Sequence, residues 1–341
     1  MMRWALVVAG ALALAGCQTD GRSTRHLAPI PPATLALMTA QGVTPSDPIL
    51  MRSFKKEAEI EVWKKGPDGR YAHFKTYPMC RWSGQLGPKL REGDRQAPEG
   101  FYDVTPASMN PNSSLYLSFN LGYPNAFDRS LNRTGSLLMV HGSCSSQGCF
   151  AMTDEAISEV YAIAREAFAG GQRSFQFQSF PFRLTAENLA KHRADPNIGF
   201  WMNLKEGADR FEVTNRETTW TVGAGRYEFG ESSAADGPEI ASLVETKRRR
   251  DAAAVAELVA KGTPAIRLVY QDGSGHASFR EMAIATSGPG GRMFGSDRNP
   301  LGDVSRPDAL VAEPAEIRLP AEPKATGSTS STRRPPEATS R

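Results

Sequence analysis

The stretch Val140–Asp154, VHGSCSSQGCFAMTD, joins a predicted strand to a predicted helix. The apolar run that leads into it indicates a strand ending at His141, and the two glycines of the stretch favour a sharp loop after that strand. A helix is expected to begin after Thr153, whose hydroxyl can accept a hydrogen bond from the first turn. Two acidic residues follow it, where the helix dipole favours negative charge. The loop therefore returns toward the end of the strand.

This geometry gives the loop a chemical interpretation. Cys149 is a nucleophile only as a thiolate, so it needs a nearby base or a lowered pKa. His141 can be that base if the loop brings the two side chains together. Gly142 and Gly148 suit such a loop, and Gly148 keeps bulk away from the backbone N–H groups beside Cys149, which could serve as oxyanion donors.

Two other uses of these side chains compete with nucleophilic catalysis. A zinc site could use His141, Cys144 and Cys149, but the Cys-x4-Cys spacing is wide and no CxxC-type fourth ligand follows, so no metal is expected. A purely structural disulfide that includes Cys149 is the second alternative, if the compartment is oxidising.

The N-terminus bears on the compartment. Arg3 is followed by an apolar stretch of about a dozen residues, shorter than the roughly 20 that a membrane-spanning helix needs. The run "LAGC" resembles a bacterial lipobox, which implies cleavage after residue 16 and a lipid-modified Cys17. Gln18, rather than Asp, favours the outer membrane over the inner one. The expected location is the periplasmic face of the cell envelope; a plain secretory signal is the alternative.

Composition and charge set few further limits on the function class. The formal net charge is +3 and 40% of the 341 residues are hydrophobic, which allows a substantial core. The basic run 247–250 lies in a predicted surface helix of an exported chain, so it is interpreted as a solvated face and no nucleic-acid partner is expected.

The rest of the chain predicts a mainly β structure with helices, of the α+β class. Short alternating segments such as Glu57–Trp63, separated by Gly-, Pro- and Asn-rich turns, indicate antiparallel strands. Further helices are expected from Thr185 and over 237–262, a hairpin over 265–282, and disorder toward the C-terminus. The predicted organisation is a signal peptide (1–16), a tether (17–50), a catalytic domain (51–204), a helical C-terminal extension (205–287) and a disordered tail (288–341).

Several motifs together resemble one family. His141-Gly142 and the later Ser146, Gly148, Cys149 and Phe150 resemble the active-site motif of L,D-transpeptidases with a YkuD-type catalytic domain, in the YafK-like branch. "APEGFYDV" at 97–104 and four further segments are similar to that branch, and the resemblance runs from about Phe54 to Tyr227. The sequence departs from the family pattern in three ways. Gln147 replaces a histidine, Ala151 replaces an arginine, and the spacing between histidine and cysteine is short.

The resemblance implies a β-sandwich or barrel-like catalytic domain and a cofactor-independent transferase of cell-wall biogenesis and cell shape. Cys149 would attack peptidoglycan stem peptides at meso-diaminopimelate, forming a thioester. His141 would be the base, and the Gly142 carbonyl would hold its other nitrogen. An amine acceptor gives a cross-link or an attached lipoprotein or outer-membrane protein. With water, the same site would be a hydrolytic amidase that releases protein from the wall.

The resemblance also bears on substrate contacts and on the other cysteines. Basic and polar residues near the motif segments could meet stem-peptide carboxylates: Arg81, Lys89, Arg95, Arg129, Arg133 and Gln147. In the family fold Cys80 lies near the loop that carries Cys144, so a Cys80–Cys144 disulfide is expected. A buried Cys144 thiol, or one that pairs reversibly with Cys149, remains open.

Two other function classes compete with the transpeptidase. A papain-like wall peptidase would pair Cys149 with a downstream histidine, His192 or His276, but here the nearby histidine precedes the cysteine. A non-catalytic peptidoglycan-binding lipoprotein would have no reason to retain both His141 and Cys149.

Overall fold

The computed structural model describes residues 24–230, 237–286 and 304–320. The predicted signal peptide and the lipidation site Cys17 lie outside these residues. In the part of the chain that is described, no helix is both long and apolar enough to cross a membrane.

The first of two five-stranded sheets has the order β3-β2-β1-β10-β5. β1 and β10 run parallel, and the remaining neighbours are antiparallel. Its strands are β1 (Ile49–Phe54), β2 (Glu59–Lys65), β3 (Tyr71–Pro78), β5 (Gly100–Val104) and β10 (Phe175–Phe180).

The second sheet has the order β4-β9-β8-β7-β6 and also contains one parallel pair, β8 with β9. Its strands are short: β4 (Arg81–Trp82), β6 (Met109–Asn110), β7 (Ser118–Asn120), β8 (Met139–His141) and β9 (Phe150–Ala151).

The two sheets share one aromatic core. The ring of Phe119 on β7 lies 5.7 Å from that of Phe175 on β10, and Phe150 on β9 lies 5.8 Å from Phe177. These rings are fully buried, so the facing surfaces of the sheets form the interior of a sandwich. The predicted α+β class with a β-sandwich catalytic core is confirmed.

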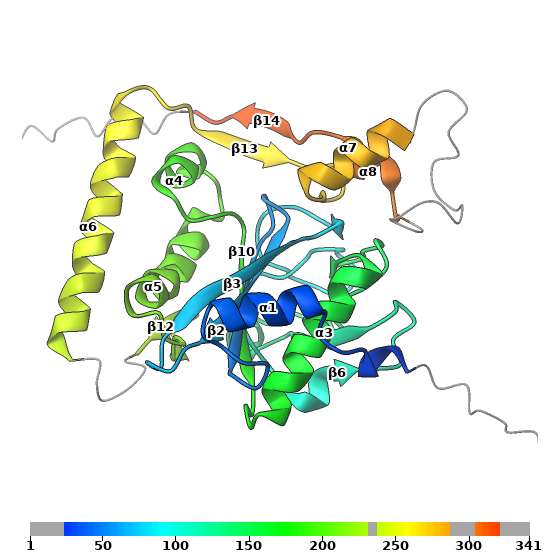
Figure 1. The fold of residues 1–341 in the computed structure, drawn as a ribbon. Helices are drawn as coiled ribbons and strands as arrows, with labels where there is room; N and C mark the ends of the chain where they lie inside the picture. The colour runs from blue at the N-terminus through cyan, green and yellow to red at the C-terminus, as the bar shows by residue number, and fades with distance from the viewer. Residues whose placement is uncertain (1–23, 231–236, 287–303, 321–341) are drawn as a thin grey trace, which may run out of the picture.

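Helices cover the sandwich from outside. Figure 1 shows α3 and α1 along one side, and α4 and α5 beside the long α6 on another. The described helices are α1 (Pro32–Ala40), α2 (Ala126–Ser130), α3 (Asp154–Ala169), α4 (Ala186–His192), α5 (Ile198–Thr214), α6 (Pro238–Ala260), α7 (Ala277–Thr286) and α8 (Pro307–Val311), with 3-10 turns at Arg25–Leu27 and Pro106–Ser108. Two two-stranded sheets complete the fold: β11 (Trp220–Gly223) with β12 (Arg226–Phe229), and β13 (Ile266–Val269) with β14 (Ala315–Arg318).

The helix predictions around the motif are confirmed. The Thr153 hydroxyl accepts the Ala156 N–H at the start of α3, and the Thr185 hydroxyl accepts the Asn188 N–H at the start of α4. α6 is the predicted surface helix, with Val244 as its buried residue.

The segment that precedes β1 differs from the predicted tether. Residues 24–48 include α1, whose Met38 side chain is buried in the core. Thr34 also donates a 2.6 Å hydrogen bond to Glu159 on α3. Apolar residues spaced along α1 give it a face to bury, so the described part of the tether is folded onto the sandwich.

The C-terminal half also differs from its prediction. The boundary predicted at 204/205 falls inside α5, where Leu204 and Ala208 belong to one core. The hairpin predicted over 265–282 is wrong, because β13 pairs with the distant β14 while Ala277–Thr286 is helical. Residues 304–320, predicted as disordered, contain α8 and β14. Leu310 is buried there, so a few apolar residues anchor an otherwise polar segment.

Candidate active site

The parallel pairing of β8 and β9 places His141 and Cys149 on one face. Val140 lies opposite Phe150 and His141 opposite Ala151, with Cys149 directly before β9. Val140 and Phe150 point into the sandwich core. Because side chains alternate along a strand, His141 and Cys149 leave on the other face of the sheet. The loop thus returns as the sequence predicts.

The imidazole of His141 is held by the next residue. Nδ1 of His141 lies 2.6 Å from the Gly142 carbonyl oxygen. A carbonyl can only accept, so Nδ1 carries the hydrogen and Nε2 keeps a lone pair. Burial lowers the pKa of His141, an effect that the hydrogen bond to Gly142 partly opposes. The ring is therefore neutral near pH 7 and can take up a proton at Nε2.

Cys149 is the free thiol of the described residues. Its Sγ accepts the Met139 N–H at 3.5 Å and lies 3.7 Å from the Leu137 carbonyl oxygen. Burial raises the pKa of Cys149, while the Met139 N–H and the charge of Lys89 lower it. With a raised thiol pKa and a lowered imidazole pKa, the proton rests on sulfur until a reaction removes it.

The predicted oxyanion donors are already engaged. The Gly148 N–H donates to the Ser83 hydroxyl at 2.6 Å, and the Cys149 N–H donates to the Ser146 hydroxyl at 3.2 Å. Ser146 also donates to the Cys149 carbonyl at 2.8 Å. Both amides therefore have hydroxyl partners in this structure, and their role as oxyanion donors stays a prediction.

Both predicted glycines are required by the surroundings. A Cβ on Gly142 would lie 2.6 Å from a carboxylate oxygen of Asp154 and 2.9 Å from Tyr116. Gly148 has φ +120°, a conformation that side chains disfavour, and its Cβ would also approach Leu138 at 3.2 Å. Larger residues at either position would displace the loop.

A disulfide joins Cys80 and Cys144, the pairing that the family resemblance favours, with Cα atoms 5.5 Å apart. Cys80 directly precedes β4, and its N–H donates to the Ala151 carbonyl. The bridge therefore ties the loop before Cys149 to the edge of the same sheet.

Two of the predicted substrate-binding arginines are committed to a carboxylate of the C-terminal extension. Arg95 donates to Asp272 at 2.6 and 3.2 Å, and the fully buried Arg81 donates to it at 3.3 Å. Sequence reasoning missed Asp272, because 177 residues separate it from Arg95 and no local pattern marks it. It also missed Ser83, which lies in one of the family-like segments but was not singled out there.

Two further predicted substrate contacts, Arg133 and Lys89, are also paired with carboxylates. Arg133 donates to the buried Asp128 at 2.9 Å, and its guanidinium stacks over Phe127. Lys89 is buried and pairs with Asp94 at 2.5 Å. Two predicted contacts are exposed: Gln147, on the loop between Cys144 and Cys149, and Arg129, whose guanidinium donates to the Pro124 carbonyl.

The histidines of the papain-like alternative serve other purposes. His192 is buried and stacks on Phe182 with ring centroids 4.7 Å apart. His276 makes a 2.8 Å hydrogen bond with Ser278. Within the described ranges, no hydrogen bond joins either imidazole to Cys149.

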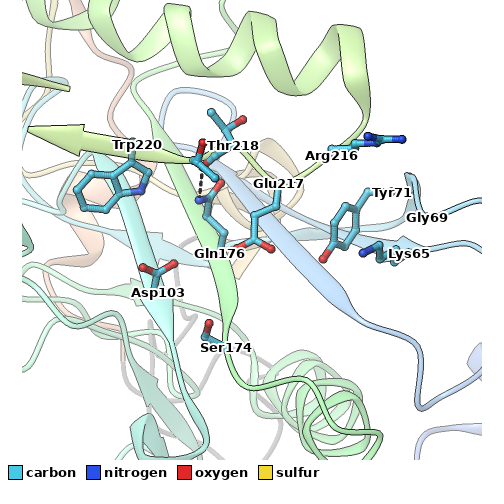
Figure 2. A pocket seen from close by; sticks show the side chains of 11 residues that line it. Lys65, Gly69, Tyr71, Asp103, Ser174, Gln176, Arg216, Glu217, Thr218 and Trp220 are labelled. Carbon is cyan, nitrogen blue, oxygen red and sulfur yellow. Dashed lines mark hydrogen bonds between the residues drawn. The ribbon is translucent and has the colours of Figure 1, made fainter. Parts of the chain in front are cut away.

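A polar cleft lies against the first sheet. This polar cleft of about 780 Å³ is lined by residues that include Asp103, Gln176, Glu217 and Trp220 (Figure 2). Gln176 lies opposite Asp103 on β10 and β5, and its neighbours Phe175 and Phe177 point into the core, so the cleft is on the outer face of the first sheet. It contains no cysteine or histidine and lies on the opposite side of the sandwich from Cys149. In the segments that are described, no group of three or more His, Cys, Asp or Glu side chains is arranged to hold a metal.

Comparison with known proteins defines the family. The chain is 40% identical over 180 residues to an Escherichia coli K12 protein named "Putative L,D-transpeptidase YafK". The match covers 53% of this chain and 73% of that protein, and the corresponding protein of E. coli O157:H7 matches equally. The chain belongs to this YafK family of L,D-transpeptidase-like proteins. No family model matches it.

Solved structures with some similarity include two bacterial proteins. The helical cell shape determining protein Pgp2 of Campylobacter jejuni aligns with a TM-score of 0.32 and 13% identity, over 69% of this chain and 80% of its own. Bd1075 of Bdellovibrio bacteriovorus aligns with a TM-score of 0.28 and 13% identity, over 54% of this chain and 77% of its own.

Proposed function

We propose that the protein is a cysteine-dependent L,D-transpeptidase that acts on the stem peptides of peptidoglycan. The observation that carries this proposal is the placement of the free Cys149 thiol and the His141 imidazole on one face of the β8–β9 pair, with Nε2 of His141 unprotonated. Membership of the YafK family supports peptidoglycan as the substrate.

The proposed reaction begins with His141 as general base. As Sγ of Cys149 attacks the carbonyl carbon at the L-centre of meso-diaminopimelate, its proton passes to Nε2. The tetrahedral adduct collapses, the amide C–N bond breaks, and the leaving amine takes the proton from Nε2. A thioester on Cys149 and the free leaving group result.

The second half-reaction regenerates the thiol. His141 accepts a proton from the incoming nucleophile, which attacks the thioester carbonyl, and the C–S bond breaks. Cys149 then recovers its proton from Nε2. An amine acceptor gives a cross-link or an attached protein. Water acting through the same residues gives hydrolysis, the alternative in which the enzyme releases protein from the wall.

Anchoring to the envelope is a further part of the proposal. The "LAGC" run supports a lipid-modified Cys17 and a periplasmic location, with the outer membrane favoured by Gln18. Cys17→Ala should abolish lipid attachment and release the protein from the membrane fraction. Membrane recovery and mass equal to those of the wild type would contradict it.

The catalytic proposal is tested with tetrapeptide muropeptides and with a muropeptide-linked lipoprotein fragment, each with and without an amine acceptor. Mass spectrometry separates new cross-links from hydrolysis products. Cys149→Ala and His141→Ala should each abolish turnover while the circular dichroism of the fold is retained. His73→Ala is the matched control, since it removes an exposed imidazole on β3, in the other sheet.

A carbapenem provides a second readout, because it acylates the thiolates of L,D-transpeptidases. One adduct mass should appear on the wild type, persist in Cys144→Ala and vanish in Cys149→Ala. Muropeptide binding without any product or adduct would favour the non-catalytic envelope lipoprotein instead. Loss of turnover in His192→Ala but not in His141→Ala would favour the papain-like arrangement.

A further inference from the structure

The C-terminal extension, taken from here on as the described residues 205–230, 237–286 and 304–320, adds a segment to the sheet that carries the site. Residues 272–276 run beside β4, where the Trp82 N–H donates to the Ser274 carbonyl at 2.8 Å and the Ser274 N–H donates back at 3.1 Å. Gly273 has φ +69°, and a Cβ there would lie 2.1 Å from the Trp82 carbonyl oxygen. This close approach is possible only with glycine, so the segment is fitted to the edge of the sheet.

That segment delivers Asp272 to a cluster of arginines. Asp272 is 4% exposed and accepts hydrogen bonds from Arg95, Arg81 and the Gly84 N–H. Arg306 from the next described segment lies 3.6 Å from the same carboxylate. Three guanidinium groups therefore meet one buried carboxylate, and removing its charge would leave them facing one another.

Direct contacts connect this cluster to the thiol. The Arg95 group that pairs with Asp272 also donates to the Ser146 carbonyl at 3.0 Å. The Ser146 hydroxyl bonds both the N–H and the carbonyl of Cys149. Ser305 adds a second link, since its hydroxyl accepts the Ser146 N–H at 2.9 Å while its carbonyl accepts from Arg81 at 3.0 Å.

Apolar contacts reinforce the same attachment. Phe279, Ala283, Val304 and Leu310 of the extension form a buried cluster with the Cys80–Cys144 disulfide and Ala151. The extension thus covers the loop on the side away from the sandwich core.

We infer that Asp272 is a positioning residue of the active site, which fixes the backbone of Cys149 through Arg95 and Ser146. The C-terminal extension is then a working part of the catalytic centre, and Arg81 and Arg95 act on the loop rather than on substrate. The inference rests on the proposed function only for its effect on turnover. Its effect on the thiol itself is independent of any substrate.

The test measures the thiol and the turnover separately in the full chain. Iodoacetamide alkylation is followed on the Cys149 peptide by mass spectrometry across pH 6–10, alongside muropeptide turnover. Asp272→Asn should loosen the loop, let solvent reach the thiol and lower its raised pKa toward the ordinary value. A fall of one unit makes alkylation at pH 7 about tenfold faster. Turnover should fall by about 10- to 100-fold, because the nucleophile is misplaced.

Three variants make the result decisive. Asp272→Glu keeps the negative charge, so its alkylation rate and its turnover should lie between those of the wild type and of Asp272→Asn. Ser305→Ala removes both hydrogen bonds between its hydroxyl and the Ser146 backbone and should shift both rates by about fivefold, which keeps the test open if Asp272→Asn does not fold. Glu313→Gln is the control, since it breaks the exposed Arg280–Glu313 pair of the extension without touching the loop.

The outcomes separate the two proposals. If wild-type turnover is absent but alkylation still responds to Asp272→Asn, the proposed function fails and the positioning role stands. If folded Asp272→Asn and Ser305→Ala have alkylation profiles and turnover within twofold of the wild type, the positioning role is wrong. A lower melting temperature without a change in the alkylation profile would also overturn it, because that is the behaviour of a merely structural contact.

Discussion

The Gly142 carbonyl lies 2.6 Å from Nδ1 of the preceding residue, His141, and this contact decides which imidazole nitrogen can accept a proton. The partner can only accept, so Nδ1 is protonated and Nε2 is the basic atom. Burial favours the uncharged forms of both His141 and Cys149. The resting site is therefore a neutral pair, and the charge separation occurs during the reaction.

This relationship predicts the pH dependence of the site. The pKa of Cys149 lies above its ordinary value of 9.0 and that of His141 below 6.5. Alkylation of Cys149 should therefore keep rising through pH 9 without a plateau near neutrality. Turnover should persist below pH 6.5 and fall only when His141 becomes protonated. Rates of alkylation and turnover across pH 4–10 provide the measurement.

His141→Gln separates the two titrations. It should abolish turnover yet leave the alkaline rise in alkylation in place. An alkylation plateau between pH 5 and 7 that disappears in His141→Gln would instead show a preformed thiolate–imidazolium pair, contrary to this expectation.

Local signals in the sequence were sufficient for much of the site. The Thr153 cap, the strand before His141 and the two glycines each depend on neighbouring residues, so the strand–loop–helix unit could be predicted. The family resemblance supplied the Cys80–Cys144 pairing, which residue spacing alone left open.

Long-range partners were the part that could not be predicted. Arg81 and Arg95 were predicted as substrate ligands because they lie near the motif segments. Their partner, Asp272, comes from 191 and 177 residues away. The same limit explains the wrong hairpin, since Ile266–Val269 pairs with Ala315–Arg318 across a segment without a regular pattern.

The Cys80–Cys144 disulfide predicts a measurable stability effect. It joins residues 64 apart, and closing a loop of that length stabilises the folded state by about 4 kcal/mol in the chain-entropy model. Cys80→Ser should lower the free energy of unfolding by up to that amount, as measured by urea denaturation.

The double variant supplies the control for this disulfide. Cys80→Ser with Cys144→Ser should cost no more than either single change, because one bond is lost in all three proteins. If the losses of unfolding free energy in the two single variants added up in the double variant, the disulfide would be contradicted. A Cys144–Cys149 cross-link as the dominant species in non-reducing peptide maps of the wild type would replace it with redox control of the nucleophile.

Buried His192 predicts a loss of stability in acid. Burial, with smaller effects from nearby lysines, lowers its pKa to about 4 from 6.5. The unfolded chain therefore binds a proton more readily, so stability falls as the pH drops from 6.5 toward 4. The difference between the two pKa values corresponds to a loss of about 3 kcal/mol in the free energy of unfolding.

His192→Phe is the informative variant, because the ring stacks on Phe182 and meets Trp201 edge-on. Between pH 7 and pH 4, the free energy of unfolding should fall by about 3 kcal/mol less in His192→Phe than in the wild type. His73→Gln, at an exposed position, should follow the wild-type curve. Parallel curves for His192→Phe and the wild type in denaturant titrations at each pH would contradict the prediction.

The cleft on the outer face of the first sheet contains two carboxylates that oppose each other. Burial raises the pKa of Glu217, and the charge of Asp103 raises it further, while Lys65 acts weakly in the other direction. Burial also raises the pKa of Asp103. Among the described residues, neither carboxylate has a hydrogen bond or ion pair, so each is held in an environment that disfavours its charge (Figure 2).

Removing one of these charges should therefore stabilise the protein near neutral pH. The folded pKa of Glu217 is above the unfolded one, so the carboxyl favours the folded state below pH 4.5 and loses that advantage as the pH rises through the folded pKa. Glu217→Gln should thus melt at a higher temperature than the wild type at pH 7 and at an equal temperature at pH 4, in calorimetric scans.

Asp103→Asn should raise the melting temperature at pH 7 in the same way. The double variant should gain less than the sum of the two single gains, because each change alone already removes their mutual repulsion. Glu316→Gln, on the exposed β14, should leave the melting temperature unchanged. A lower melting temperature for Glu217→Gln at pH 7 would mean that its carboxylate has a stabilising partner in solution, contrary to the environment described.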